Sequence, residues 1–373
     1  MTYKTHTVSA IHILVAQVQL RYGRDTPEGR KAGQWLAGGY RGILIALTGD
    51  LDYMCKTLLL PRWSKQSSPC SLCRCTKHGP LSYLDNRLPD PSNNIEGAPW
   101  LGTWWTFEEW KNWDEKSACP LFLLAWLSAC NVALDWMHVK FLGADQYLYG
   151  GCVYLLVFKI LPGPPKENLH KIWCWMKKYY EIHKPLVRYR QFSKLTMFLR
   201  KRDFPKLRGK AAEVKAFGKV LQAMWLHFMD QGDTQHKQIK FLLKNNVELD
   251  NILAQYPVTD GHYRLPESAY KRFVTACFKV AQTTKALNEY YASQDMKVFN
   301  VTSKVHCMLH VALLAKYLHP AMVWCYKGED YMRVVQTLLQ SCTRGNNPFQ
   351  TMNKATRHYM LGSQLAWEKD AEL

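Results

Sequence analysis

A short apolar stretch that ends in an acidic residue is the first candidate for chemistry. The run from Gly42 to Gly49 is rich in β-prone residues and is followed by Asp50. This pattern predicts a buried strand, and the carboxyl end of a strand is where open α/β sheets place their functional residues. Asp50 is therefore a candidate metal ligand. The alternative is that Asp50 only caps a helix beginning near Leu51.

Two cysteines separated by two residues form the next candidate site. Cys70 and Cys73 follow Asp50 by 20 and 23 residues, and their own spacing lets both thiolates reach one ion from a tight turn. A structural zinc site needs two further nitrogen or sulfur ligands. Cys75 and His78 are close enough in the chain to complete a local zinc knuckle.

A pair of histidines offers distant ligands instead. His306 and His310 lie four residues apart, which places both imidazoles on one face of a helix. His306 follows Cys73 by 233 residues, so a shared ion would join remote parts of the chain. The competing interpretation is that both are core histidines of an apolar helix.

Further acidic and histidine residues lie between the cysteine and histidine pairs and after them. Asp135-x-x-His138 lies between the cysteine and histidine pairs, and Glu329 follows His310 by 19 residues. The arrangement resembles the RNase-H-like core of DD-E transposases, in particular the group that includes hAT, CACTA and the V(D)J recombinase. In that group a catalytic Asp precedes a Cys pair, an Asp/Cys-x-x-His motif introduces a helical insertion, and a His pair precedes the catalytic Glu.

The resemblance implies a role for each of these residues. Asp50 would be the second catalytic carboxylate and Glu329 the last, and such carboxylates hold Mg²⁺ during phosphodiester cleavage and strand transfer. Asp135 and His138 would form the Asp-x-x-His motif. The ligands of one structural Zn²⁺ would be Cys70, Cys73, His306 and His310.

One carboxylate of the family pattern is missing. Upstream of Asp50 the chain has only Asp25 and Glu28, which form a predicted helix start. Asp52 and Asp145 are poor substitutes, because one falls on the helix after the strand and the other follows a glycine turn. We therefore expect an N-terminally truncated, transposase-derived DNA-binding protein with lost or reduced activity. The alternative is a non-catalytic, zinc-stabilised nucleic-acid-binding protein.

The charge of the chain favours a polyanionic partner. Lys and Arg number 49 against 30 Asp and Glu, a formal net charge of +19, and such a field most often attracts nucleic acid. Between Lys166 and Lys219 there are 16 basic and four acidic residues, interleaved with aromatic residues. The candidate DNA contacts are Lys177, Lys178, Arg188, Arg190, Arg200, Lys201, Arg202, Lys206, Arg208 and Lys210.

The cysteine usage and the apolar runs bear on location. Twelve cysteines in a long chain without a convincing export signal favour free thiols in a reducing compartment. The apolar runs from Pro120 to Leu134 and from Tyr147 to Leu161 are shorter than a bilayer span. We expect a nuclear protein that binds DNA, with self-association into a homo-oligomer left open and no membrane partner. A helical membrane-surface protein is a third interpretation.

Helix signals dominate around a short strand region. Thr106-x-x-Glu109 has the pattern of a capping box, and Glu267 to Ser293 has helical spacing. The expected class is α/β and mostly helical, a partial RNase-H-like core with a sheet that is interrupted by a large all-α insertion. The expected segments are 1–60, partial core with Asp50; 61–118, zinc loop and Trp-rich segment; 119–162, core with the Asp-x-x-His motif; 163–300, basic helical insertion; and 301–373, C-terminal helices with the His pair and Glu329.

Overall fold

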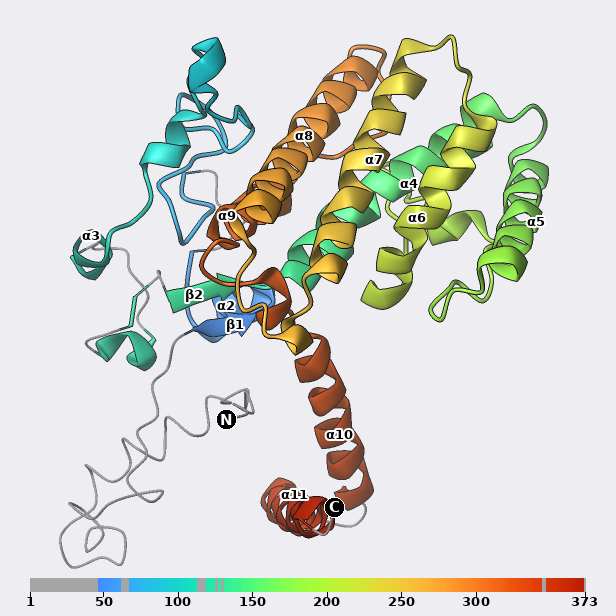
Figure 1. The fold of residues 1–373 in the computed structure, drawn as a ribbon. Coiled ribbons are helices and arrows are strands. Elements are labelled where there is room, and N and C mark those ends of the chain that lie inside the picture. The colour runs from blue at the N-terminus through green and yellow to red at the C-terminus, as the bar shows by residue number, and fades with distance from the viewer. Residues whose placement is uncertain are drawn as a thin grey trace, which may run out of the picture. The chain divides into compact units, whose positions relative to one another are not determined.

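The structure is a computed structural model, and Figure 1 shows its course. Its contacts divide the chain into two units, residues 1–47 and 48–373. Asp25 and Glu28 lie outside the described residues. The described ranges are 46–61, 67–112, 119–124, 127–128, 131–343 and 347–371.

Two short parallel strands make up the sheet of the described residues. They are β1 (Leu47–Gly49) and β2 (Val132–Leu134). The expected strand before Asp50 is confirmed, and its apolar Leu47 is buried. Because parallel strands share one carboxyl edge, Asp50 and Asp135, which directly follow β1 and β2, belong to the same edge.

Local capping explains the first helices. Helix α2 (Leu51–Lys56) begins where the carboxylate of Asp50 accepts a hydrogen bond from the Tyr53 amide at 2.5 Å. Helix α3 (Phe107–Lys111) begins at the predicted capping box, in which the Thr106 side chain and Glu109 hydrogen-bond each other's backbone amides. Both caps satisfy amides that a helix start leaves without partners.

The chain after β2 is one nearly continuous helical stretch. It consists of the π-helix η7 (Met137–Ala144), α4 (Asp145–Leu155) and a second π-helix, η8 (Leu156–Ile160). The prediction of a glycine turn before Asp145 is wrong, because the helical stretch continues through Gly143. Gly150 instead permits close packing, because a Cβ there would lie 2.8 Å from the backbone of Pro205 and Lys206.

Long helices form most of the remaining structure. Helix α7 (Thr234–Gln255) packs against α6 (Ala211–Phe228) and α8 (Glu267–Ala292), and α5 (Pro165–His183) packs against α6 and η8. Helix α8 agrees with the predicted Glu267–Ser293 helix to within one residue. The described chain is thus mostly helical with a small sheet, as expected.

The C-terminal part continues with three helices. Helix α9 (Ser303–Leu314) contacts α8, η7 and β2, while α10 (Tyr326–Cys342) packs against α11 (Pro348–Ala371). Among the described residues, no helix combines the length and apolar character needed to cross a bilayer. Helix α9 is buried along most of its length, so polar side chains on it must find partners in the interior.

A buried ionic cluster joins η7, α4 and α7. The ammonium of Lys140 lies 2.8 Å from Asp145 and 3.3 Å from Asp250, and the side chains of Lys140 and Asp145 are fully buried. Asn246 donates a further hydrogen bond to Asp145 at 2.9 Å. Burial alone would lower the pKa of Lys140, but the two carboxylates raise it above its ordinary value. Asp145 therefore has a structural partner and does not substitute for the missing catalytic acid.

Candidate metal centre

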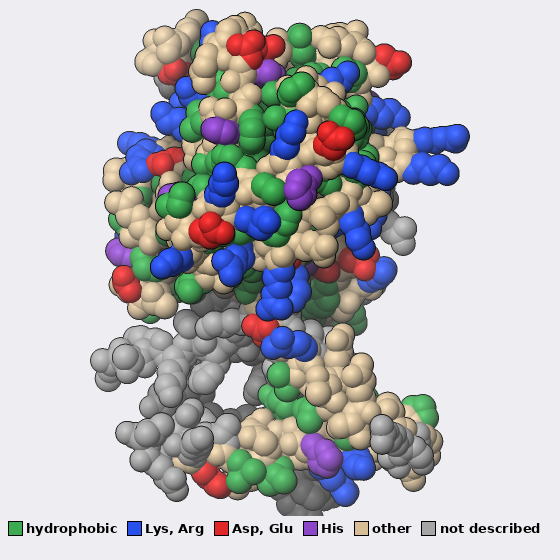
Figure 2. Space-filling model, turned by 90° about the vertical axis from the view of Figure 1, so that its right-hand side faces the viewer, with side chains coloured by type: hydrophobic (Ala, Val, Ile, Leu, Met, Phe, Trp, Pro, Cys, Tyr) green, Lys and Arg blue, Asp and Glu red, His purple; other side chains and the backbone are tan. Residues whose placement is uncertain are grey.

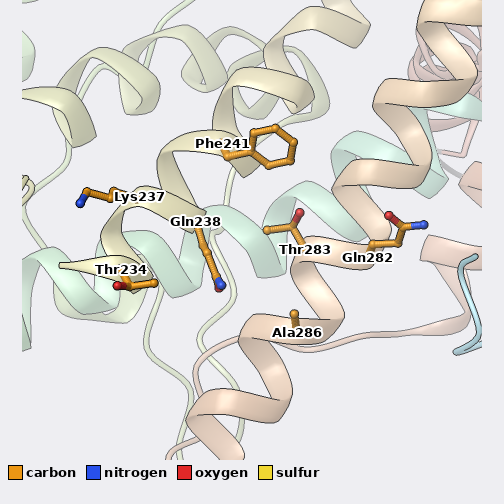
Figure 3. Close-up of a pocket in the computed structure, with 7 residues that line it drawn as sticks. All are labelled: Thr234, Lys237, Gln238, Phe241, Gln282, Thr283 and Ala286. Carbon is orange, nitrogen blue, oxygen red and sulfur yellow. The ribbon is translucent and has the colours of Figure 1, made fainter. Parts of the chain in front are cut away.

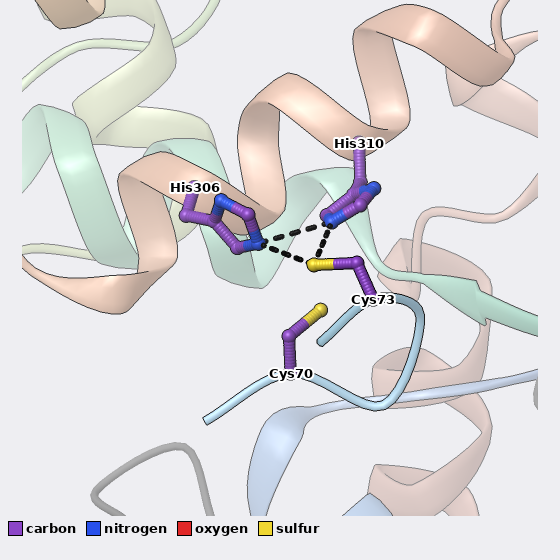
Figure 4. A group of neighbouring side chains, drawn as sticks. All are labelled: Cys70, Cys73, His306 and His310. Atoms are coloured by element: carbon purple, nitrogen blue, oxygen red, sulfur yellow. Dashed lines mark hydrogen bonds between the residues drawn. The ribbon is translucent and has the colours of Figure 1, made fainter. Parts of the chain in front are cut away.

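The cysteine and histidine pairs predicted to share a metal meet in the structure (Figure 4). Cys70 and Cys73 come from the loop after α2, and His306 and His310 lie one turn apart on α9. One ligand atom from each of the four residues lies within 4.8 Å of the others, and all four residues are buried. The sequence prediction of a remote shared cluster is confirmed as a metal-compatible site.

The spacing of the ligand atoms fits a small tetrahedral ion. Cys73 Sγ lies 3.3 Å from Nε2 of His306 and 3.3 Å from Nε2 of His310, and the two Nε2 atoms are 3.0 Å apart. Zinc bonds of about 2.0 Å to nitrogen and 2.3 Å to sulfur give tetrahedral edges of about 3.3 Å between nitrogens and about 3.5 Å between nitrogen and sulfur. Small outward shifts would therefore admit a zinc ion.

The electrostatics of the cluster call for a cation. Burial, and then the neighbouring His310, lower the pKa of His306 and favour the neutral imidazole that a metal requires. Burial would raise the pKa of Cys70, but hydrogen bonds from Cys73 and Cys75 lower it well below its usual range. The pKa of Cys73 is raised, by burial and then by hydrogen bonds with Cys70 and Cys75. A metal ion at the centre of the cluster would take the place of the thiol protons, because cysteine binds metals as the thiolate.

Tryptophans from the segment after the cysteine loop enclose this cluster. The ring of Trp100 packs edge-on against His306 at 4.4 Å between centroids, and Trp104 packs in the same way against His310 at 4.4 Å. The Trp104 backbone also forms a bridge to Cys73. The Trp-rich segment therefore forms a local apolar core around the ligands.

The nitrogens on the far side of the two imidazoles have a different environment. Nδ1 of His306 and Nδ1 of His310 are buried with no hydrogen-bond partner among the described residues. If Nδ1 carries the proton of each neutral ring, both Nε2 lone pairs point at the shared centre. Two lone pairs at 3.0 Å repel each other, and a bound cation removes that repulsion.

The local zinc knuckle finds only partial support. Cys75 is buried and hydrogen-bonds with Cys70 and Cys73, whereas His78 is exposed. The compact four-ligand group takes its nitrogens from α9. His78 is therefore not a member of the cluster, and Cys75 is a neighbour of it.

The Asp-x-x-His motif forms contacts of its own at the end of β2. One oxygen of Asp135 accepts hydrogen bonds from the Met137 amide at 2.9 Å and the Cys325 amide at 3.0 Å. The other oxygen contacts Nδ1 of His138. Asp135 thus ties the residue just before α10 to the sheet edge that also carries Asp50.

The two predicted catalytic acids differ in how far the structure describes them. Asp50 has the capping role considered as its alternative, since it accepts from Tyr53. Glu329 lies in α10, but its side chain is outside the described part of the structure. Asp52, the other proposed substitute, is exposed and pairs with Lys56 at 2.7 Å. The catalytic assignments therefore stay predictions.

The predicted nucleic-acid contacts lie mainly on the surface. Figure 2 faces the side on which α5 lies in Figure 1, and Lys and Arg side chains are spread over it with fewer acidic ones among them. Lys206 is half-buried, 5.1 Å from the centre of the Tyr147 ring. The exposed candidates are Lys177, Lys178, Arg188, Arg190, Arg200, Lys201, Arg202, Arg208 and Lys210.

A groove between α7 and α8 is separate from these residues (Figure 3). Its volume is about 410 Å³, and it contains none of the predicted site residues. It holds one charged side chain, so it offers no cluster able to bind a metal or move a proton. Its lining consists of Thr234, Lys237, Gln238, Phe241, Gln282, Thr283 and Ala286.

Comparisons with known proteins add no relative. No family model, curated protein or solved structure matches the chain. The chemistry of the clusters and the surface therefore has to carry any functional conclusion. The residue that sequence reasoning missed is Cys325, whose thiol joins Asp135 and His138 in a second potential metal group. A single cysteine four residues before Glu329 gave no spacing signal that could have found it.

Proposed function

We propose that this chain is a transposase-derived DNA-binding protein whose core is stabilised by one structural zinc. The observation that carries the proposal is the meeting of the Cys70/Cys73 pair with the His306/His310 pair. That junction is what the resemblance to DD-E transposases implies. Although the two pairs are 233 residues apart, they form one compact buried group of sulfur and nitrogen ligands, the donor set that structural zinc prefers.

The zinc would position the remaining parts of the predicted site. It links the loop that follows α2 to α9, and Asp50 lies at the start of α2. Asp135 holds the amide of Cys325 at the other end of the same region. Fixing these segments relative to one another serves a site assembled from distant acids, because the productive geometry tolerates only small displacements.

DNA binding would come from the exposed basic residues of α5 and of the segment that follows it. These basic side chains would bind the phosphate groups of DNA through their charge. The affinity for DNA would therefore fall steeply with salt concentration and depend little on the DNA sequence. The exposed Arg200 pairs with Asp203 at 2.8 Å and donates to the Tyr147 hydroxyl at 3.2 Å. Such partners orient a side chain that still presents its charge to solvent.

Catalysis would require Mg²⁺ at Asp50 and Glu329, and we propose that it is lost or weak. The first acid of the family pattern is missing upstream of Asp50 in the sequence. A second candidate function, non-catalytic zinc-stabilised nucleic-acid binding, is favoured by one specific contact, the capping of α2 by Asp50. Nicking of supercoiled DNA in Mg²⁺ separates residual catalysis from none: nicking that is lost on Asp50→Asn would support a remaining catalytic site, and no nicking by the wild type would support the non-catalytic function.

Zinc content of the purified full chain tests the central claim. Elemental analysis compares the wild type with Cys70→Ser and with the His306→Ala/His310→Ala double variant. Loss of one zinc per chain in both variants supports the shared site, and a zinc content that is unchanged by removal of the histidines contradicts it. Cys174→Ser is a matched control, because Cys174 also lies beside a histidine, His170, at 3.4 Å but outside the cluster.

A further inference from the structure

A second group of metal-type ligands lies at the carboxyl end of the sheet. Asp135 directly follows β2, His138 is in the first turn of η7, and Cys325 directly precedes α10. One ligand atom from each lies within 4.8 Å of the other two. Three segments that are remote in sequence thus bring a carboxylate, an imidazole and a thiol to one point.

Backbone contacts hold the carboxylate of this group in place. One oxygen of Asp135 is occupied by the amides of Met137 and Cys325. The other oxygen faces Nδ1 of His138. The thiol of Cys325 hydrogen-bonds with the Asp135 carboxylate and with Thr48 of β1. The three side chains are therefore preorganised without depending on solvent.

A cysteine nucleophile activated by the histidine does not fit these contacts. The imidazole turns Nδ1 toward the carboxylate, and the thiol itself faces that same carboxylate. Burial, then the charge of Asp135, raises the pKa of Cys325 to about 12. A thiol in this setting remains protonated unless a cation replaces its proton.

We propose that Asp135, His138 and Cys325 bind one divalent transition-metal ion of the zinc type, with one coordination position left open. Thiolate and imidazole ligands select such ions over Mg²⁺. The site differs from the four-ligand cluster in access, since the side chain of His138 is 17% exposed and Cys325 is half-buried. Three protein ligands with an accessible fourth position are the arrangement of zinc ions that bind or activate an exchangeable ligand.

Neighbouring side chains define what the open position would face. The negative charges of Asp50 and Asp135 both raise the pKa of the Cys325 thiol. The same two charges also act to raise the pKa of the Lys304 ammonium, which burial lowers. Lys304 donates to the carbonyls of His138 at 3.0 Å and Leu142 at 3.2 Å. A ligand entering the fourth position would therefore meet an ammonium and a carboxylate, a setting suited to water or an anionic oxygen.

Metal stoichiometry tests this inference independently of the proposed function. The full chain is loaded with Zn²⁺, desalted and analysed for zinc, with Cys325→Ser and Asp135→Asn as variants. Asn keeps an oxygen for the two backbone amides, so Asp135→Asn separates metal binding from folding. We expect two zinc ions per wild-type chain, one in each variant, and affinity for the second ion lowered more than about 100-fold. Cys174→Ser should retain both ions.

Cobalt substitution supplies a second measurement on the same proteins. Co²⁺ bound by thiolates has an intense charge-transfer absorption, and the wild type would have three thiolates on its two ions. Cys325→Ser should lower that absorption by about one third, and Cys70→Ser should leave the share that belongs to Cys325. These results would show two independent sites.

The outcomes separate the two claims. One zinc per wild-type chain, unchanged by Cys325→Ser and lost with Cys70→Ser, would overturn the second site while leaving the proposed function intact. One zinc that is lost with Cys325→Ser and kept by Cys70→Ser would support the second site and contradict the structural zinc. Two zinc ions retained by both Cys325→Ser and Asp135→Asn would also overturn the inference.

Discussion

Two buried groups of ionisable side chains hold the core together, and they balance their charge in different ways. Around Lys140, the protein supplies its own cation, which lies between Asp145 and Asp250. Around Cys73, the neighbours are the other cysteine of the pair and two imidazoles, and burial lowers the pKa of His306. The first group contains its own counter-charge, whereas the second is compatible with a bound metal ion.

The difference shows what a buried anion needs. Removing a carboxylate or thiolate from water is strongly unfavourable unless an opposite charge and hydrogen bonds replace the solvent. A lysine meets that need at the helix interface of η7, α4 and α7, and the proposed zinc would meet it between the cysteine loop and α9. Each arrangement predicts a different response to substitution, chelation and acid.

The largest expected effect is removal of the metal from the four-ligand cluster. Cys70→Ser, or a strong chelator added to the wild type, should lower the free energy of unfolding by about 4 kcal/mol or more, because bound zinc contributes directly to folding. Thermal unfolding followed by circular dichroism measures it. The chelator should have little further effect on Cys70→Ser, and an equal shift in both proteins would assign the effect to another ion.

Lys140→Met should destabilise the protein by about 3 to 5 kcal/mol, because it leaves buried carboxylates without their cation. Chemical denaturation measures the change, and the chelator should not alter it. Adding Asp145→Asn to Lys140→Met should recover part of the lost stability, since one of the orphaned charges is removed. Additive losses in the double variant would contradict the proposed pairing.

His319 is a third case, a buried base. Among the described residues it has no acidic partner. Its Nδ1 accepts the Ala321 amide at 3.0 Å, and burial lowers its pKa to about 4. The unfolded value is about 6.5, so the folded state binds fewer protons between these values. Its contribution to stability is complete above pH 6.5 and is lost as the pH falls toward 4.

The measurement for His319 is the difference in stability between pH 7 and pH 5. His319→Asn keeps a side-chain acceptor for the Ala321 amide but does not titrate. The pH-dependent loss should be smaller in this variant by about 1 to 3 kcal/mol. An identical loss in both proteins would place the acid sensitivity in other groups, such as the metal ligands.

The smallest effect on folding is expected at the exposed bases. Replacing Arg200, Lys201 and Arg202 together by Ala should change stability by less than about 0.5 kcal/mol per site. DNA affinity should fall, and the slope of its logarithm against salt should decrease by about one for every phosphate that these bases no longer neutralise. Binding measured at several salt concentrations tests this, and an unchanged slope would remove these residues from the interface.

Local signals in the sequence predicted local structure well. The capping box at Thr106 and Glu109, the strand before Asp50 and the helix from Glu267 are all present. Each depends on interactions within a few residues, which the sequence displays directly. The metal cluster was predicted for another reason, because the resemblance joined two short spacings that neither alone would connect.

Long-range packing was beyond the sequence. Cys325 carries no motif, and its contact with Asp135 depends on how α10 meets the sheet edge. A glycine turn was expected before Asp145, yet the helical stretch continues through it, and Gly150 lies inside α4, where the absent side chain admits the backbone of Pro205 and Lys206. Such roles depend on a neighbour far along the chain, which local propensity does not contain.

The junction of Cys73 with His306 also has a consequence for how the protein is made. The histidine lies 233 residues after the cysteine, so an ion shared by the two could not close the loop until α5, α6, α7 and α8 have been synthesised. Closure of so long a loop contributes to a slow, late step in folding. If the proposed zinc binds there, the cysteine loop must wait as reduced thiols during translation, and occupancy by the metal would mark a chain whose helices are already complete.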